Sequence, residues 1–219
     1  MSFHRGPRIT YDSLYLLYDP GTPRCYPGTG TVVNDLGPYG HNGVLINGLA
    51  HSNSNVGCFD FDGTNDYISV NTTSIGTVSQ YTVAHWCRRD SENRMHIGTS
   101  NNFFYWYGDN SWRWVHSTGA QEHYYSKNVS IPLGTWGYYV ATYDGTVVKI
   151  YRQGIFQSSV AASGTANFDN QDWTFGQFAS SSTYAFNGLG GIVSIHTRAL
   201  TATEILQNFN ASKHRFGLV

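Results

Sequence analysis

Short stretches in which apolar and polar residues alternate recur along nearly the whole 219-residue chain, and turn-forming residues separate them. Such alternation is typical of β-strands that bury one face. The clearest case runs from Thr135 to Tyr143, turns at Asp144-Gly145 and returns from Val147 to Tyr151, which predicts a β-hairpin. Many short strands without helices between them favour an all-β chain with two packed antiparallel sheets over a parallel α/β sheet.

The same pattern predicts further strands at 13–18, 43–46, 58–61, 66–70, 81–87, 103–107, 111–115, 173–176 and 188–196. The turn at Asp62-Gly63 suggests that the strands before and after it form a hairpin-like pair. Residues 27–55 are rich in Gly, Pro and Asn, and a loop of that length favours a packed loop with a role. One helix is expected after the capping box Thr201-Ala202-Thr203-Glu204, with Ile205, Leu206 and Phe209 sharing a face.

Composition excludes several classes of function. Charged residues make up only 12% of the chain and the net charge is −1, which argues against general nucleic-acid binding. No run approaches the roughly 18 apolar residues of a membrane helix, so no membrane insertion is expected. The basic start has no apolar segment of a secretory signal behind it. Cys25, Cys58 and Cys87 form no CxxC pair and are expected to be buried thiols, as in a reducing cytosol.

The order of the segments resembles the laminin-G-like jelly roll of the concanavalin A-like lectin/glucanase superfold. The resemblance covers about residues 11–215 and is carried by Phe59–Ile68, Tyr81–Trp86, Leu133–Gly145, Val148–Gly154 and Phe186–Ile205. The opening segment Leu16–Gly30 and the closing segment Glu204–Gly217 narrow it to the stand-alone form of this domain among structural proteins of tailed, particularly marine, bacteriophages.

This resemblance implies a non-enzymatic protein of a phage particle, made in the host cytoplasm and located in the virion as a decoration, fibre or tail component. Its expected partners are capsid, neck or tail proteins and further copies of itself, and a host polysaccharide if it acts as an adhesin. We expect one jelly-roll domain at 11–215, a tail at 216–219 and an N-terminal arm at 1–10. The assembly residues proposed on the arm are Phe3, Arg5 and Arg8.

A cluster of aromatic and amide residues is the candidate for sugar contact. Aromatic rings stack on the apolar faces of sugars, while Asn and Asp bind the hydroxyl groups. Either Phe103, Tyr105 and Tyr107 or Phe104 and Trp106 should face away from the core, because alternate strand residues face opposite ways. The alternative is that these rings pack inside or against a neighbouring subunit. The predicted glycan-binding residues are Tyr105, Trp106, Tyr107, Asp109, Asn110, Trp112 and Trp114.

The acidic residues offer weak evidence for catalysis and leave a metal site open. A glycoside hydrolase needs two carboxyl groups about 5–10 Å apart. Glu92, Glu122 and Glu204 are widely spaced, and Asp60 and Asp62 share a strand face without a third acid at the right interval, so hydrolysis is the least favoured alternative. Laminin-G-like domains often hold calcium at the rim, and the resemblance implies Asp62, Asn65 and Asp66 as possible ligands; plain turn capping is the alternative. No other cofactor is expected.

Overall fold

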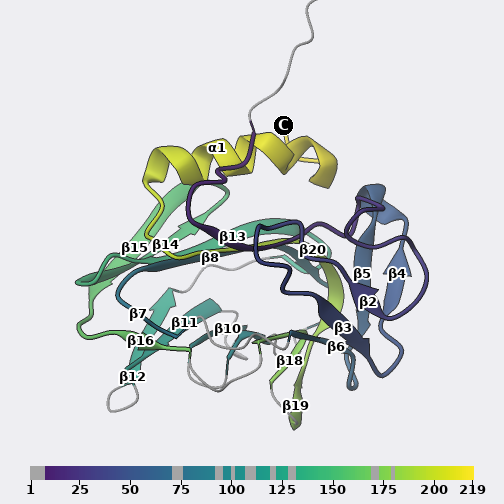
Figure 1. Cartoon of the computed structure of the whole chain (residues 1–219), viewed down its shortest axis with the longest axis horizontal. Helices are drawn as coiled ribbons and strands as arrows, with labels where there is room; N and C mark the ends of the chain where they lie inside the picture. The colour runs from purple at the N-terminus through teal and green to yellow at the C-terminus, as the bar shows by residue number, and fades with distance from the viewer. Residues whose placement is uncertain are drawn as a thin grey trace, which may run out of the picture.

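A computed structural model describes residues 8–70, 76–91, 96–99, 102–106, 112–118, 122–127, 132–168, 173–178 and 181–219. Two antiparallel eight-stranded sheets face each other as two layers, and one helix lies outside the first sheet (Figure 1). The predicted all-β class with two antiparallel sheets and one short C-terminal helix is therefore confirmed.

The first sheet has the strand order β15-β14-β13-β8-β20-β5-β4, and β1 pairs with the second half of β20. Strand β20 is long enough to pair with β5 near its start and with β1 near its end. In chain order its strands are β1 (Leu14–Tyr18), β4 (Ala50–Ser52), β5 (Cys58–Asp62), β8 (Tyr81–Arg89), β13 (Trp136–Tyr143), β14 (Val147–Arg152), β15 (Ile155–Ala161) and β20 (Asn187–His196).

The second sheet has the strand order β12-β11-β10-β9-β17-β6-β3-β2. Its strands are β2 (Val32–Val33), β3 (Gly43–Ile46), β6 (Tyr67–Val70), β9 (His96–Gly98), β10 (Phe103–Trp106), β11 (Trp112–Ser117), β12 (Glu122–Lys127) and β17 (Trp173–Phe175). Two small ribbons pair β7 (Thr77–Val78) with β16 (Ala166–Asn167) and β18 (Gln177–Phe178) with β19 (Ser181–Ala185).

Two predictions about local pairing had different outcomes. The hairpin around Asp144-Gly145 is confirmed as β13 and β14. The predicted pairing of residues 58–61 with 66–70 is wrong, because β5 belongs to the first sheet and β6 to the second. The turn that starts at Asp62 therefore joins the two layers instead of closing a hairpin, and β5 pairs with β20 and β4.

The main core fills the space between the two sheets. Its largest fully buried side chains include Trp114, Trp173 and Tyr139. Gly188 allows a close approach of two backbones: a Cβ there would lie 2.1 Å from the carbonyl oxygen of Arg88, and its φ is +145°. All three cysteines are buried free thiols, as predicted.

A second core lies between the first sheet and helix α1 (Ala202–Ser212) with the following turn η2 (Lys213–Phe216). The capping box is present, since Thr201 accepts from the backbone of Glu204 and the Glu204 carboxylate accepts from the backbone of Thr201. Ile205 and Asn208 are the buried residues of the helix, whereas Leu206 is exposed, contrary to the predicted face. Trp136 and Tyr151 also pack in this second core. A further short helical turn, η1, spans Ser54–Val56.

Residues 8–10 lie against α1. The Gln207 side chain donates a 2.6 Å hydrogen bond to the carbonyl of Arg8, and the amide of Thr10 donates a 2.7 Å bond to the Asn208 side chain. The predicted assembly residues Phe3 and Arg5 lie outside the described residues. No helix in the described part of the chain has the length and apolar character needed to cross a membrane.

Candidate functional site

The predicted sugar-binding cluster is only partly described, and one of its members is corrected. Trp114 has 0% exposure and its indole N–H donates a 2.7 Å hydrogen bond to the Tyr81 hydroxyl. Phe104 is buried against it, with ring centroids 4.6 Å apart. Trp114 is therefore a core residue and not a surface platform, because β11 turns this side chain toward the first sheet.

The other members of that cluster stay predictions. The backbone register pairs Tyr105 with Arg113 and Trp106 with Trp112 in the β10–β11 ladder. The side chains of Tyr105, Trp106 and Trp112, and all of Tyr107, Asp109 and Asn110, lie outside what the structure describes.

The turn at Asp62–Asp66 uses its acidic groups to hold backbone amides. Asp62 Oδ1 accepts a 2.7 Å hydrogen bond from the amide of Thr64, and Asp66 Oδ2 lies 3.4 Å from the amide of Asp62. The Asn65 carbonyl accepts from the Asn47 side chain. Burial, and secondarily the charge of Asp62, raise the pKa of Asp66. These contacts are those of turn capping, and calcium at this turn stays a prediction.

Other acidic and histidine groups in the described chain serve the fold. Glu204 forms an ion pair with Arg198 as well as its helix cap, and Arg198 lowers its pKa to about 2. His85 lies in the core against Phe104 and Tyr139, where burial lowers its pKa to about 3. Among the described residues no group of three or more His, Cys, Asp and Glu side chains has the arrangement of a metal site.

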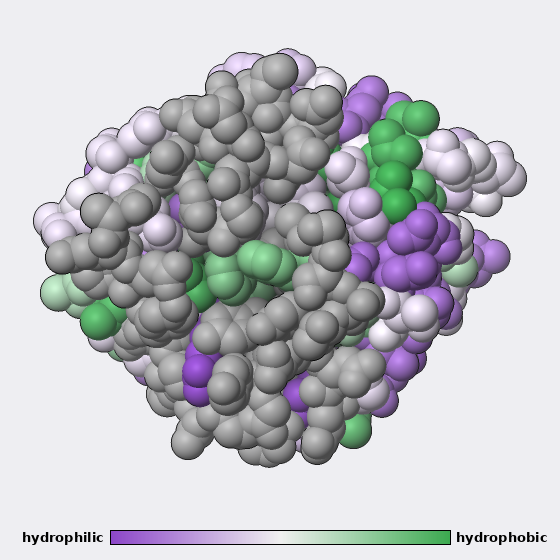
Figure 2. Space-filling view, turned by 90° about the horizontal axis from the view of Figure 1, so that it is seen from below, coloured by the Kyte–Doolittle hydropathy of each residue, from purple (hydrophilic) through white to green (hydrophobic). Residues whose placement is uncertain are grey.

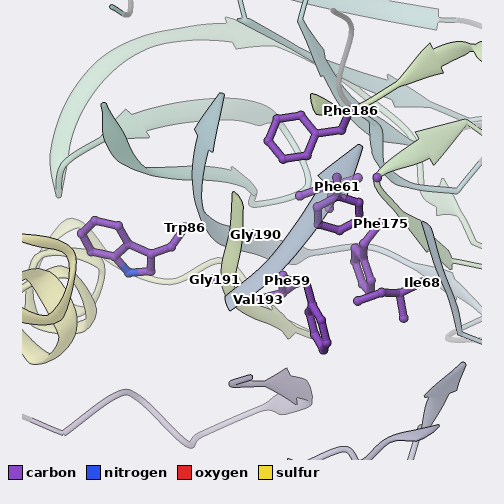
Figure 3. Close-up of a pocket in the computed structure, with 11 residues that line it drawn as sticks. Phe59, Phe61, Ile68, Trp86, Phe175, Phe186, Gly190, Gly191 and Val193 are labelled. Carbon is purple, nitrogen blue, oxygen red and sulfur yellow. The ribbon is translucent and has the colours of Figure 1, made fainter. Parts of the chain in front are cut away.

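An apolar cavity beside β20 is too small for a saccharide. It measures about 20 Å³, roughly the space of one water molecule. Figure 3 shows Phe61, Phe175 and Phe186 on one side of β20 and Trp86 on the other, toward the helix. Gly190 and Gly191 lie between them, and a Cβ at either position would lie only 2.8 Å from a ring carbon, of Phe61 and of Phe216 respectively. A saccharide therefore has to bind elsewhere than in this cavity.

A cluster of three rings at the surface is the strongest candidate for that role, and we call it the Tyr39 cluster: Tyr15, Tyr39 and His41. Tyr39, in the β2–β3 connection, is 64% exposed. Its ring lies 5.8 Å from that of His41 and 5.4 Å from that of Tyr15. The Tyr15 and His41 rings stack at 4.3 Å, with 28° between their planes. Two buried or half-buried rings thus support one exposed ring.

The loop that carries Tyr39 is held in one shape by Asp35. Its Oδ1 accepts from the amides of Leu17 (2.9 Å) and Gly37 (2.7 Å), and its Oδ2 accepts from the amide of His41 (3.0 Å). The Tyr18 hydroxyl donates a 2.6 Å bond to the His41 carbonyl. The backbone of Gly40 has φ +71°, which glycine adopts without strain. A loop tied in this way loses little conformational entropy when it binds a ligand.

Several polar atoms of the cluster have no internal partner. The Nε2 atom of His41 is buried without a hydrogen bond. The hydroxyl groups of Tyr15 and Tyr39 likewise form no hydrogen bond with the described part of the chain. Burial, rather than the Asp35 charge, dominates at His41 and lowers its pKa, so the ring is neutral at pH 7. The cluster therefore combines an exposed aromatic face with neutral donors and acceptors.

The surface beside this loop is mixed in character. Val32 and Val44 face each other across β2 and β3 and are both exposed. On the right of Figure 2, the side on which β2 and β3 lie in Figure 1, hydrophobic and hydrophilic residues stand next to one another. The expectation that the long loop of residues 27–55 is packed is met here, whereas Tyr39 and His41 were not among the predicted site residues.

Comparison with known proteins defines the class. A family profile described as the concanavalin A-like lectin/glucanases superfamily matches residues 62–206, about two thirds of the chain. The chain belongs to this family of jelly-roll domains. No curated protein matches it in sequence.

Solved structures share the fold at low identity. Domain 4 of an extracellular arabinanase from Geobacillus stearothermophilus, solved in complex with arabinotriose, has a TM-score of 0.69 and 17% identity, and the match covers 92% of this chain and 100% of that domain. The ligand-binding domain of botulinum neurotoxin serotype D, in complex with N-acetylneuraminic acid, has a TM-score of 0.72 and 14% identity over 91% of this chain and 51% of that one. The binding domain of Paraclostridial Mosquitocidal Protein 1 has a TM-score of 0.69 and 15% identity over 91% and 52%. This chain thus spans about half the length of the toxin domains.

Proposed function

We propose that this chain is a non-catalytic carbohydrate-recognition module that stacks a sugar ring on Tyr39. The observation that carries the proposal is the exposed Tyr39 ring, backed by His41 and Tyr15 on a loop that Asp35 holds rigid. Family membership supports it, as do sugar-bound structures of the same fold: the arabinanase domain with arabinotriose and the toxin domain with N-acetylneuraminic acid.

The chemistry of the cluster suits a sugar. The C–H face of a pyranose or furanose ring packs on an aromatic ring, and its hydroxyl groups need neutral donors and acceptors at the edge of that ring. The hydroxyl group of the exposed Tyr39 can act as both donor and acceptor. The Asn42 side chain, whose oxygen accepts from the Asp35 amide, adds an exposed amide N–H₂ group.

The same geometry favours binding over hydrolysis. The carboxyl group nearest the cluster, Asp35, already accepts three backbone hydrogen bonds. These bonds hold the carboxylate in place and occupy both of its oxygens, which leaves it poorly placed to act as a proton donor or a nucleophile. Asp62 and Asp66, a close pair of carboxyl groups in the described chain, serve the turn between β5 and β6.

We further propose that the module is displayed on a tailed bacteriophage particle, in several copies. The support is the resemblance of the opening and closing segments to phage structural proteins. Those segments contact each other, since Arg215 pairs with Asp19. The arm before Arg8 would dock on a capsid, neck or tail protein, and mass spectrometry of purified particles tests the location directly. Absence of the chain from intact particles would contradict it.

Titration calorimetry of the whole chain against an oligosaccharide panel tests the sugar proposal. Tyr39→Ala is expected to weaken binding about tenfold or more, because it removes the stacking surface. Tyr11→Ala is the matched control, since Tyr11 is a tyrosine of similar exposure (61% against 64%) outside the cluster. Equal affinities of the two variants, or no binding of any saccharide, would refute the proposal. Incubation of the bound oligosaccharide without appearance of shorter products is the expected result for a non-catalytic module.

A further inference from the structure

We infer that the saccharide bound at the Tyr39 cluster is uncharged: a neutral glycan, not one rich in uronic, sialic or sulfated residues. This inference rests on the proposed function and adds the chemical class of the ligand. It is argued from the distribution of charge around the cluster.

The first observation is a long stretch of sequence without cations. Between Arg24 and Arg88 there is no Lys or Arg, although this stretch supplies β2 to β8 up to Cys87 and the loop that carries Tyr39. The ionisable acids in the same stretch are Asp35, Asp60, Asp62 and Asp66. Proteins that bind carboxylate or sulfate groups normally use Arg or Lys for charge-assisted hydrogen bonds, and the loop that carries Tyr39 contains neither.

The second observation is local. The carboxylate of Asp35 accepts a 3.0 Å hydrogen bond from the backbone amide of His41, and its charge, secondary to burial, acts to raise the pKa of both Tyr15 and His41. His41 is the only residue of the cluster that could become cationic, and burial lowers its pKa. An anionic sugar at Tyr39 would therefore meet a fixed negative charge without a compensating positive one.

The third observation is that Asp35 has no freedom to move away. Its two oxygens are tied to the amides of Leu17, Gly37 and His41. A Cβ on Gly37 would lie 2.9 Å from Oδ1, which shows how closely the backbone wraps the carboxylate. Two cations that follow the first sheet and helix α1 are paired elsewhere: Arg198 with Asp12 and Glu204, and Arg215 with Asp19.

The test compares neutral hexose oligosaccharides with the same oligosaccharides oxidised at C6 to uronates, at about 50 and about 500 mM NaCl. We expect the neutral member of a pair to bind at least about tenfold more tightly at low salt, with an affinity that salt leaves unchanged. High salt should strengthen uronate binding, because it screens the repulsion from Asp35, and the difference in affinity between the two members of a pair should become smaller.

A charge variant makes the test specific. Pro38 is exposed, next to Tyr39, and no hydrogen bond depends on its side chain. Pro38→Lys is expected to improve uronate binding severalfold, and Pro38→Gln, an uncharged side chain of similar length, is expected not to.

The outcomes separate the two proposals. If uronates bind at least as tightly as neutral oligosaccharides and Tyr39→Ala abolishes that binding, the inference of a neutral ligand is refuted. The proposal that the chain is a carbohydrate-recognition module then still stands. If Tyr39→Ala changes the binding of neither the neutral oligosaccharide nor the uronate, both the proposed function and this inference are refuted.

Discussion

Arg215 and Asp19, 196 residues apart in sequence, form an ion pair that joins the end of the chain to its beginning. The same guanidinium donates to the carbonyl of Asn55 at 2.8 Å and to that of Gly57 at 2.6 Å. Both members of the pair are mostly shielded from solvent. One side chain thus fastens the turn after α1 to two loops beside the first sheet.

Loss of this side chain should destabilise the fold. Arg215→Met is expected to lower the free energy of unfolding by about 3 kcal/mol, because it leaves Asp19 unpaired and two carbonyls without donors. Arg88→Met is the control, since the Arg88–Asp90 pair is more exposed and should contribute less than about 1 kcal/mol. If a urea titration finds the same loss of unfolding free energy in both variants, Arg215 does not stabilise the fold in this way.

Acid should weaken the fold through two buried histidines. Burial lowers the pKa of His85 to about 3 and that of His196 to about 4, from an ordinary 6.5. Below pH 6.5 the unfolded chain therefore binds protons that the folded chain does not, and stability falls as the pH falls. Each group contributes a slope of about 1.4 kcal/mol per pH unit down to its folded pKa.

The variant His85→Leu isolates one of these contributions. Between pH 6.5 and 4 the two histidines together lower the free energy of unfolding. The variant should remove roughly half of that decrease. Glu204 contributes only at the acid end of this window, because the stability it provides is lost as the pH falls from 4.5 toward about 2, and it contributes equally in both proteins. An unchanged pH dependence in His85→Leu would contradict the assignment.

Trp114→Ala should behave as a core variant. The indole is fully buried and bonded to Tyr81, so its removal is expected to cost about 3–5 kcal/mol. Thermal unfolding measures this. A stable Trp114→Ala protein that merely lost sugar binding would restore Trp114 as a binding residue.

Truncation should divide the arm into two parts. Removal of residues 1–7 leaves the hydrogen bonds of Arg8 and Thr10 to α1 in place and should not change the unfolding temperature. Removal of 1–10 also exposes the pocket that Ile9 lines and should lower that temperature. If the arm docks on the particle, removal of 1–7 alone abolishes incorporation; unchanged incorporation would contradict the docking proposal.

Local signals in the sequence predicted local structure well. The β13–β14 hairpin follows from alternation around Asp144-Gly145, and the start of α1 follows from the capping box at Thr201. The side chains that decide these features are neighbours along the chain, so a short window contains the information.

Features that depend on distant partners were not predicted. Alternation alone leaves open which face of β10 is buried. The face that carries Phe104 is buried because Phe104 packs against Trp114 on the neighbouring strand β11. The sheet to which β5 belongs is decided by β20, more than 120 residues later. The Tyr39 cluster forms only when β1 brings Tyr15 against His41, 26 positions further on, so no local pattern marks it.

The most direct test of the account is a map of amide chemical-shift changes in the labelled whole chain during titration with a neutral oligosaccharide. We predict that the largest changes occur at residues 35–42 and at Tyr15, and that they disappear in Tyr39→Ala but persist in Tyr11→Ala. Largest changes elsewhere in the jelly roll, with residues 35–42 unaffected, would contradict the central claim that this chain binds sugar at Tyr39.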